Sequence, residues 1–469
     1  MNLPKRNGES FLDPPFRDWI YLLKRNRQLL TSYRFLICGV SFPEIRKGVR
    51  ERLSSLKISP DDPLLLTGHQ PHFVHPGIWF RFFLLDRARE ELGVNSAAFI
   101  LDSDLNRVLT VPVPREWEGE LLLQEIPFPL ESGVFEFLSS PLKEDWEKFL
   151  RNIEDCFNFP EAVFARENFS KIRNFTWKRE NFSNFCSRLR RFYEGKPEYP
   201  EFPLSEILKE EFRLFFLHIA ENAESFALAY NASNARWRKE KKSRSKDMPF
   251  PDLKISQGEI ELPFWIVDQG ERFPLFLDSR GILKSGEKVW GRLEGAVTDW
   301  KIRPRAATLT MFLRLFACDL FLHGLGGGEY EEAVDFLIQE FFGVEPPAFA
   351  RASLTLFFPG FDSEELQQLK ERVREMKKNP EKFLSARLAR QFQDLILQKV
   401  KLTQEKLNKE KYQELQNLNS QLLSFLEREL QELQAEIQRR EERGKILSFR
   451  QYPFFFFRSD EIQRLARQA

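Results

Sequence analysis

The fold is decided by one stretch of the sequence, residues 64–77, Leu-Leu-Leu-Thr-Gly-His-Gln-Pro-His-Phe-Val-His-Pro-Gly. Its apolar start, Leu64 to Thr67, predicts a short buried strand that Gly68 ends. Pro76 suits the first turn of a helix, because the N–H group that proline lacks has no partner there. Residues 78–92 are therefore expected to form a helix, with a histidine-rich loop between the strand and the helix.

A second strand is expected at residues 97–101, where five apolar residues follow the helix. Strand, helix and strand in this order predict a βαβ unit with a parallel pair of strands. The acidic loop Asp102-Ser103-Asp104 comes directly after the second strand. Because ligands of open parallel sheets bind outside the carboxyl ends of the strands, the histidine loop and the acidic loop are expected to lie side by side.

The pattern of the remaining chain predicts further elements and six segments. Beyond residue 250 it predicts a hairpin at 261–278, helices at 307–322 and 329–342, and a last strand at 352–357. The segments are a helical lead-in (1–60), the first part of an α/β core (61–114), a mostly helical insertion (115–250), the second part of the core (251–361), a coiled-coil arm (362–445) and a C-terminal segment that docks on the body (446–469).

The arm is predicted from its leucine spacing. The apolar residues of its second half are separated by threes and fours, which is the period of a coiled-coil seam with one departure from strict heptads. Pro380 interrupts the pattern, so two helices are expected. The seam consists of Leu415, Leu418, Leu422, Leu426, Leu430, Leu433 and Ile437.

Three of the five histidines, His69, His72 and His75, fall within seven residues of each other. Three roles fit their place between a buried strand and a helix. They can contact a phosphate or another anion at the helix N-terminus. They can bind zinc or iron, with Asp102 or Asp104 as an oxygen ligand. One imidazole can act as a general base near neutral pH.

Two polar stretches further along the chain precede expected helices. Ile302-Arg303-Pro304-Arg305 is a tight loop whose arginines suit bidentate binding of a carboxylate or phosphate. A glycine-rich turn follows His323, and such a turn can hold an anion through its backbone N–H groups. The residues expected to bind a substrate are Thr67, Gly68, Gln70, Arg303, Arg305, His323, Gly326, Gly327 and Gly328.

The composition limits the classes of partner. Lysine and arginine number 71 against 70 aspartates and glutamates, so no overall charge would recruit a nucleic acid. No run of about 18 apolar residues occurs, so no membrane span is expected. The four cysteines form no CxxC pair and no secretory signal follows Met1. A cytoplasmic protein with reduced thiols is therefore expected.

These motifs resemble those of the BshC family, the cysteine-adding enzymes of bacillithiol biosynthesis. The family has a Thr-Gly-Gln-Gln loop before its first core helix, to which residues 67–70, Thr-Gly-His-Gln, are similar. Its acidic segment after the next strand looks like residues 102–104, and its Arg-Pro pair before a helix looks like residues 303–304. Its Gly-Gly-x-x-Glu turn is similar to residues 327–329. The likeness spans residues 60–445 in short islands, and His72 and His75 lie outside the family pattern.

The resemblance implies a Rossmann-like core akin to class I nucleotidyltransferases and a homodimer joined by the coiled coil. It implies a ligase that joins cysteine, or a similar small amino or thiol compound, to the amine of a glucosaminyl-malate or another small substrate. In that reading the arginines clamp a carboxylate. A nucleotide such as ATP or ADP is a more suitable cofactor than zinc, and no bound metal is expected. The catalytic residues would be His69, His72, His75, Asp102 and Asp104.

Two other functions stay open at this point. A metal-dependent hydrolase would use the three histidines together with Asp102 and Asp104. A non-enzymatic scaffold would use the coiled coil alone.

Overall fold

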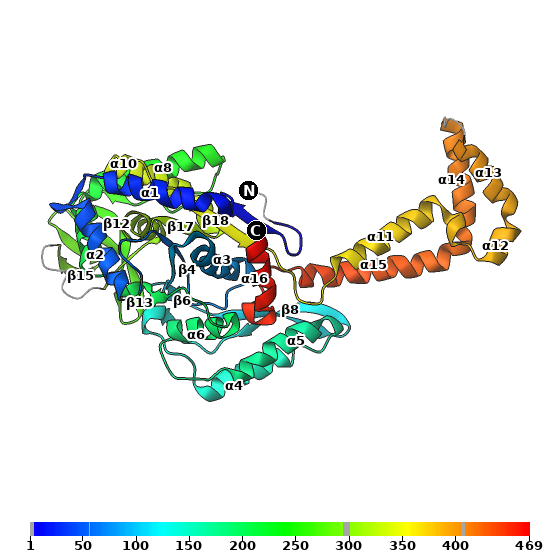
Figure 1. Ribbon diagram of the computed structural model, residues 1–469, viewed down its shortest axis with the longest axis horizontal. Helices are drawn as coiled ribbons and strands as arrows, with labels where there is room; N and C mark the ends of the chain where they lie inside the picture. The colour runs from blue at the N-terminus through cyan, green and yellow to red at the C-terminus, as the bar shows by residue number, and fades with distance from the viewer. Residues whose placement is uncertain (1–3, 56, 294–300, 405–408) are drawn as a thin grey trace.

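The computed structural model describes residues 4–55, 57–293, 301–404 and 409–469. Figure 1 shows a rounded body of sheets and helices, from which an arm of helices projects to one side. The C-terminal helix lies on the body near the root of the arm. The protein is therefore of the mixed α/β class, as predicted.

A mostly parallel sheet forms the centre of the body. Five neighbouring strands pair in parallel, and β1 at the edge is antiparallel to β18. The predicted parallel pairing of β4 with β5 is confirmed. Within the described residues, the strand order is β1 (Ser10–Asp13), β18 (Phe349–Leu354), β17 (Leu320–His323), β4 (Leu64–His69), β5 (Asn95–Ile100) and β10 (Glu201–Pro203).

The chain changes sides of this sheet between β4 and β17. From β4 it adds β5 and then β10 on one side, and it later returns to the other side of β4 to add β17 and β18. In open parallel sheets such a switch point leaves a crevice outside the carboxyl ends of the two neighbouring strands. His69 ends β4 and His323 ends β17, so one histidine stands on each side of this switch-point crevice.

The first strand and helix form much as their sequence predicts. α3 (Pro76–Leu92) begins at the proline, and Gly93 ends it with a φ of +62°. Gly68, however, does not end the strand, because β4 continues to His69. A Cβ atom at Gly68 would lie 2.4 Å from the ring of Phe99 on β5. This glycine therefore allows close packing of two strands and makes no turn.

The N-terminal segment is not wholly helical. The predicted helices are present as α1 (Trp19–Ser32) and α2 (Phe42–Ser54), but β1 precedes them and a short hairpin of β2 (Leu36–Ile37) and β3 (Val40–Ser41) separates them. The apolar side chains of α2 belong to the core on one face of the sheet, together with Leu64 and Leu66. Those of α3 belong to the core on the other face, together with Leu65. Alternate side chains of β4 thus serve both cores, as the period of a strand requires.

Residues 115–250 contain more than helices. β8 (Glu120–Pro127) lies here, and it pairs with β7 (Thr110–Trp117). β10 also lies here and belongs to the central sheet, which corrects its assignment to a helical stretch. Three residues are too few for a sequence period to show. The helices are α4 (Lys143–Glu154), α5 (Val163–Ser170), α6 (Phe182–Glu194), α7 (Glu210–Glu221) and α8 (Ala223–Lys241).

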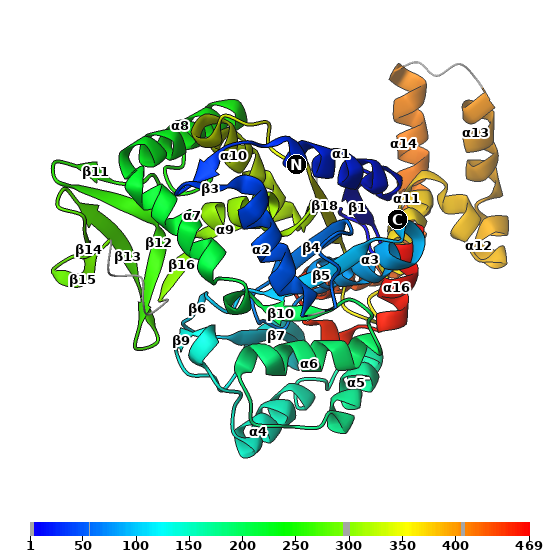
Figure 2. The same ribbon diagram turned by 60° about the vertical axis from the view of Figure 1, so that its left-hand side comes forward.

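A second, antiparallel sheet stands beside the central sheet (Figure 2). The predicted hairpin of β12 and β13 is confirmed, with Gln269 and Gly270 at positive φ in its turn. β16 pairs with the other edge of β12. The strands of this second sheet are β11 (Ile255–Ser256), β12 (Glu259–Asp268), β13 (Glu271–Asp278), β14 (Ile282–Ser285), β15 (Lys288–Arg292) and β16 (Ile302–Pro304).

The helix predicted at residues 307–322 is wrong from Cys318 onward. α9 (Ala306–Phe312) continues as a π-helical turn to Ala317, and β17 follows. A continuous apolar run cannot distinguish a buried strand from a buried helix. As a consequence, the glycine-rich turn does not join two helices. Gly326 to Gly328 form the first turn of α10 (Leu325–Phe342), directly after a strand of the central sheet.

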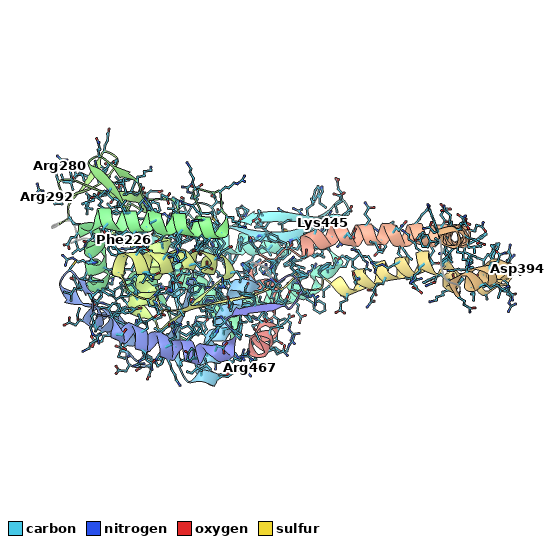
Figure 3. All side chains as sticks on the ribbon, turned by 90° about the horizontal axis from the view of Figure 1, so that it is seen from above. Phe226, Arg280, Arg292, Asp394, Lys445 and Arg467 are labelled. Carbon is cyan, nitrogen blue, oxygen red and sulfur yellow. The ribbon has the colours of Figure 1, made fainter. Side chains whose placement is uncertain are left out.

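The arm is a pair of long helices, α11 (Ser363–Lys378) and α15 (Glu427–Leu447), that run outward and back (Figures 1 and 3). Ion pairs Lys370–Glu441 (2.7 Å) and Arg372–Glu429 (2.8 Å) connect them. Asp394 lies near the outer end, and Arg280 lies at the opposite end of the body (Figure 3). The tip contains α12 (Ala386–Gln391), α13 (Gln393–Gln404) and α14 (Lys409–Leu423).

The leucine seam of the arm is covered in part by the chain itself. Leu418, Leu422 and Leu426 are buried, and Leu415 and Leu430 are half-buried. The homodimer expected from the resemblance stays a prediction. These three buried leucines, however, already have their partners within one chain.

The C-terminal segment packs on the body. Phe454, Phe455 and Phe456 are fully buried in the core that contains α3. The Phe454 N–H donates to the carbonyl of Val74 at 2.8 Å, which connects this segment to the histidine loop. α16 (Ser459–Gln468) lies against α3. No helix in the described part of the chain is long and apolar enough to cross a membrane.

Candidate functional site

The candidate residues of the sequence lie mainly along the carboxyl edge of the central sheet. The histidine loop follows β4, the acidic loop follows β5, and the glycine-rich turn follows β17. Gln70 Nε2 donates to Asp104 at 3.2 Å, so the first two loops touch each other. The structure thus places three of the four predicted stretches at one edge, around the switch-point crevice.

The three histidines of the loop have different surroundings. His72 is the most exposed of the three residues, and its ring centroid lies 6.2 Å from that of His69. His69 is half-buried, and its Nδ1 lies 3.1 Å from the carbonyl oxygen of Gln70. His75 caps α3, because its Nδ1 accepts the N–H of Gly77 at 3.1 Å. His72 is therefore the histidine that an incoming molecule would meet.

Burial lowers the pKa of all three imidazoles. The pKa of His69 lies well below its ordinary value, and the charge of Arg81 lowers it further. Burial lowers the pKa of His75 to about 4. The pKa of His72 is also lowered by the surrounding protein, against the opposing effect of Asp104. At neutral pH the loop is uncharged, so an anion at this edge has to be neutralised by other groups.

The two aspartates of the acidic loop are held differently. Asp102 is buried and accepts hydrogen bonds from the Ser205 hydroxyl (2.6 Å) and the Ser205 N–H (3.1 Å). Burial raises the pKa of Asp102 to about 6. Asp104 is half-buried and pairs with Arg272 of β13 at 2.5 Å. Asp104 therefore faces the space between the two sheets, whereas Asp102 fixes the chain beside β10.

The expected arginine clamp is occupied by the chain's own glutamates. Arg303 binds Glu136 through two atoms, at 2.7 and 2.9 Å. The Glu136 N–H in turn donates to the carbonyl of Asp102 at 2.7 Å, so Arg303 reaches the acidic loop through this glutamate. Arg305 binds Glu261 at 2.7 Å. Arg303 thus joins the second sheet to the turn at residues 135–137, and Arg305 joins the start of α9 to the second sheet, so both side chains already bind carboxylates of the chain.

His323 and the glycines stand across the crevice from the histidine loop. His323 is buried, and its Nε2 lies 3.5 Å from Glu331, which pairs with the buried Arg314 at 2.7 Å. Burial lowers the pKa of His323 as well. Gly326 and Gly327 are exposed at the start of α10. The backbone of this turn is therefore open to solvent at the mouth of the crevice.

Sequence reasoning missed Arg81, which lies between β4 and β17. Its guanidinium donates to the Thr67 hydroxyl at 3.0 Å and approaches the Leu322 carbonyl at 3.4 Å. Thr67 itself donates to the Leu322 carbonyl at 2.7 Å, so this predicted site residue bridges the two strands. The one signal for Arg81 is a lone charge within an apolar helical run, Ile-Trp-Phe-Arg-Phe-Phe-Leu-Leu, residues 78–85.

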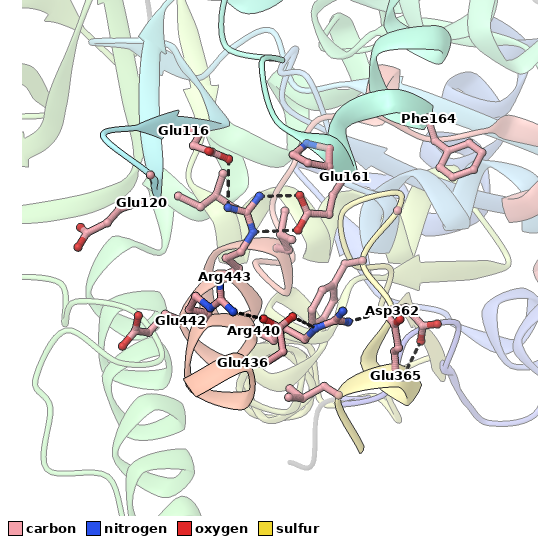
Figure 4. A pocket seen from close by; sticks show the side chains of 18 residues that line it. Glu116, Glu120, Glu161, Phe164, Asp362, Glu365, Glu436, Arg440, Glu442 and Arg443 are labelled. Atoms are coloured by element: carbon pink, nitrogen blue, oxygen red, sulfur yellow. Dashed lines mark hydrogen bonds and ion pairs between the residues drawn. The ribbon is translucent and has the colours of Figure 1, made fainter. Parts of the chain in front are cut away.

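One cavity lies beside the histidine loop, and another lies away from it at the root of the arm. A small one of about 20 Å³ adjoins His69, His72, Ser183 and Arg190. It holds about one water molecule, and the buried Ser183 hydroxyl has no hydrogen-bond partner among the described residues. A larger one of about 740 Å³ lies at the root of the arm. There Arg443 and Arg440 already bind carboxylates of the chain (Figure 4).

The geometry does not favour a metal site in the histidine loop. Within the described residues no three histidine, cysteine or carboxylate side chains are grouped to hold a metal ion. The Nδ1 atom of His75 is used in capping α3, and Asp102 is bound to Ser205.

Fold and site together define an α/β protein with polar loops at the switch point of a parallel sheet. Histidine and aspartate side chains follow β4 and β5, and an open helix N-terminus follows β17. No protein-family model matches the chain, and no curated protein matches it. The function is therefore argued from the site and from the resemblance of its motifs.

Proposed function

We propose that the protein is a BshC-like ligase, which joins cysteine or a similar small amino or thiol compound to the amine of a small polar substrate. In the proposed reaction, the carboxyl carbon of cysteine bonds to the amine nitrogen. The nitrogen loses a proton, and one carboxyl oxygen leaves with the phosphate of a nucleotide such as ATP. The proposed core is Rossmann-like, which the strand order around β4 supports.

One observation carries the proposal. The islands of sequence that resemble the family are far apart in the chain, yet three of them follow neighbouring strands at the carboxyl edge of the central sheet, and the fourth is linked to this edge through Glu136. Gln70 contacts Asp104 at 3.2 Å, and Asp102 is connected through Glu136 to Arg303. Ligands of open parallel sheets bind at this edge.

The side chains at the edge suit proton transfer from an amine. His72 is exposed and its lowered pKa keeps it neutral near pH 7, so it can accept a proton. Asp104 is fixed by Arg272 and Gln70, and its carboxylate can orient an amine that donates hydrogen bonds. We assign proton transfer to His72 and amine orientation to Asp104. His69 and Asp102 hold the loops in place.

The proposal is tested by incubating the purified protein with cysteine, glucosaminyl-malate and ATP, and by measuring the condensed product with mass spectrometry. We expect product with the native protein. Replacing the general base should lower the rate by about 100-fold or more, so His72→Ala should form almost none. Asp104→Asn should raise KM for the amine more than it lowers kcat.

His218→Ala is the matched control. His218 stacks on Phe342 at the far end of α10, whose N-terminus opens at the crevice. That helix is roughly 27 Å long at 1.5 Å per residue. This variant should keep native activity. Equal product formation by His72→Ala and His218→Ala would show that the histidine loop does not carry the reaction.

We propose in addition a cytoplasmic homodimer joined by the arm, as the resemblance implies. The arm extends away from the body, and its tip exposes Leu397, Val400, Tyr412 and Phe425. Exposed apolar side chains of this kind favour association. Light scattering at micromolar concentration should give the mass of two chains, and the mass of one chain would contradict the homodimer.

A further inference from the structure

The guanidinium of Arg81 is buried without a countercharge. Its side chain is 4% exposed, and its Nε atom has no hydrogen-bond partner among the described residues. Its bonds go to the neutral oxygens of Thr67 and Leu322. None of the carboxylates in the described ranges forms an ion pair with it, whereas buried charges in proteins are ordinarily paired.

The buried arginine lies next to an open helix N-terminus. A Cβ atom at Gly324, the residue before α10, would lie 3.8 Å from Cζ of Arg81 and 3.9 Å from its Nη2. The first three N–H groups of a helix have no partner within the helix. In α10 these belong to Leu325, Gly326 and Gly327, and no side chain caps them in the structure as described. The Arg81 guanidinium and the N-terminal amides of α10 therefore lie close together at the switch point, and both produce a positive electrostatic potential there.

The neighbouring groups do not replace the missing countercharge. His69, His75 and His323 stand near enough to feel the charge of Arg81, and the pKa of each is lowered. Glu331, the nearest acid beside His323, is bound to Arg314. The crevice is therefore a fixed positive site lined by neutral imidazoles.

We propose that the Arg81 guanidinium and the N-terminal amides of α10 form an oxyanion site, which takes a phosphate or carboxylate group of the substrate. A helix N-terminus and an arginine are the usual partners of such groups, because both offer several N–H donors at once. The inference rests on the proposed function for its place at the carboxyl edge. It goes further by naming the chemical class that is bound there.

The site is tested by isothermal titration calorimetry with pyrophosphate and, in a separate arm, with succinate. The native protein should bind one equivalent of one of these probes, and the arm that binds distinguishes phosphate from carboxylate. Arg81→Gln should weaken binding by about tenfold or more, because a hydrogen bond to a charged group is lost. Arg81→Lys, which keeps the charge, should weaken it less.

A second pair of variants tests the helix amides without touching the buried arginine. Leu325 is the first residue of α10, and Gly324 before it has φ −74° and ψ 170°, a conformation that suits the residue before a proline. Leu325→Pro removes one N–H and fits the helix. It should weaken binding several-fold, whereas Leu325→Ala keeps the N–H and should bind as the native protein does. Circular dichroism checks that each variant is folded.

The outcomes separate this inference from the proposed ligase. No binding of either probe by the native protein, or native affinity in both Arg81→Gln and Leu325→Pro, would overturn the oxyanion site. Loss of binding in Leu325→Pro alone upholds it if Arg81→Gln does not fold. If the native protein binds the probe but forms no product in the ligase assay, the proposed reaction is contradicted and the oxyanion site is upheld. His72→Ala should bind the probe, because the probe contacts Arg81 and the helix amides.

Discussion

The single residue Asp102 shows how burial raises the pKa of a carboxyl group. Its folded pKa of about 6 lies above its ordinary value of 3.8. The folded state therefore binds this proton more tightly than the unfolded state. The stability that this provides is present below about pH 4 and is lost as the pH rises through 6.

Asp102→Asn should remove this pH dependence. The amide can still accept the Ser205 N–H and donate to its hydroxyl, but it cannot ionise. Relative to the native protein, the variant should gain up to about 3 kcal/mol of stability between pH 4 and pH 7. Thermal unfolding at a series of pH values measures this. A difference between the two proteins that stays constant over the range would contradict the assignment.

Gly68 is a second single residue whose role can be measured. Because an added Cβ would lie 2.4 Å from the ring of Phe99, Gly68→Ala should destabilise the fold by roughly 1–3 kcal/mol. Gly326→Ala is the matched control, since nothing lies within 4 Å of its Cβ position. Denaturant unfolding should separate the two variants. Equal stability of both would mean that β4 and β5 can move apart without cost.

The residues that sequence reasoning missed share a physical cause. Arg81 and Glu136 act through contacts with segments far away in the chain, namely β17 and β16. His72 and Asp104 could be proposed from the sequence because a polar residue soon after a buried strand is a local signal. The pairing of Arg303 with Glu136 is a tertiary contact, which no local pattern encodes.

At the scale of elements, the same distinction holds. α3 was predictable because Pro76 and Gly93 mark its ends, and the β12–β13 hairpin because Gly270 marks its turn. β17 was not, because its leucine and phenylalanine residues continue the apolar run of α9. In the arm, Pro380 interrupts the helical pattern as predicted, because it follows the end of α11 and precedes α12.

The arm offers a test of its internal packing. Leu422 is fully buried at the tip, so Leu422→Ala should cost roughly 2–5 kcal/mol of local stability. Hydrogen exchange should accelerate in α11 and α14, which are in contact, and stay unchanged in the central sheet. Leu228→Ala on α8, at a residue 57% exposed, is the control and should leave exchange as it is. Protection of α14 that persists in Leu422→Ala would show that the seam is not packed within one chain.

At the scale of the whole molecule, Arg443 joins the arm to the body. It binds Glu161 through two nitrogens (2.6 and 2.9 Å) and Glu116 at 3.1 Å, at the edge of the larger cavity (Figure 4). Arg443→Ala should weaken this junction by about 1–3 kcal/mol.

Small-angle scattering should then report a wider range of arm positions, and proteases should cut more readily near Gly360. Arg428→Ala breaks an exposed ion pair on the arm's own surface and should change neither measurement. Identical scattering of native protein and Arg443→Ala would mean that the helices themselves fix the arm.

The order of strands in the central sheet also determines how long β4 must wait for its neighbour β17 during synthesis of the chain. β4 ends at His69, but its neighbour β17 begins only at Leu320. At about 5–20 residues per second, the ribosome needs roughly ten to fifty seconds to deliver the second strand after the first. During that interval one edge of β4, including the backbone beside Leu65 and Leu66, lacks the strand with which it finally pairs. A nascent chain of this protein therefore carries an open strand edge through most of translation, and it should depend on chaperones that shield such edges until residue 323 has emerged.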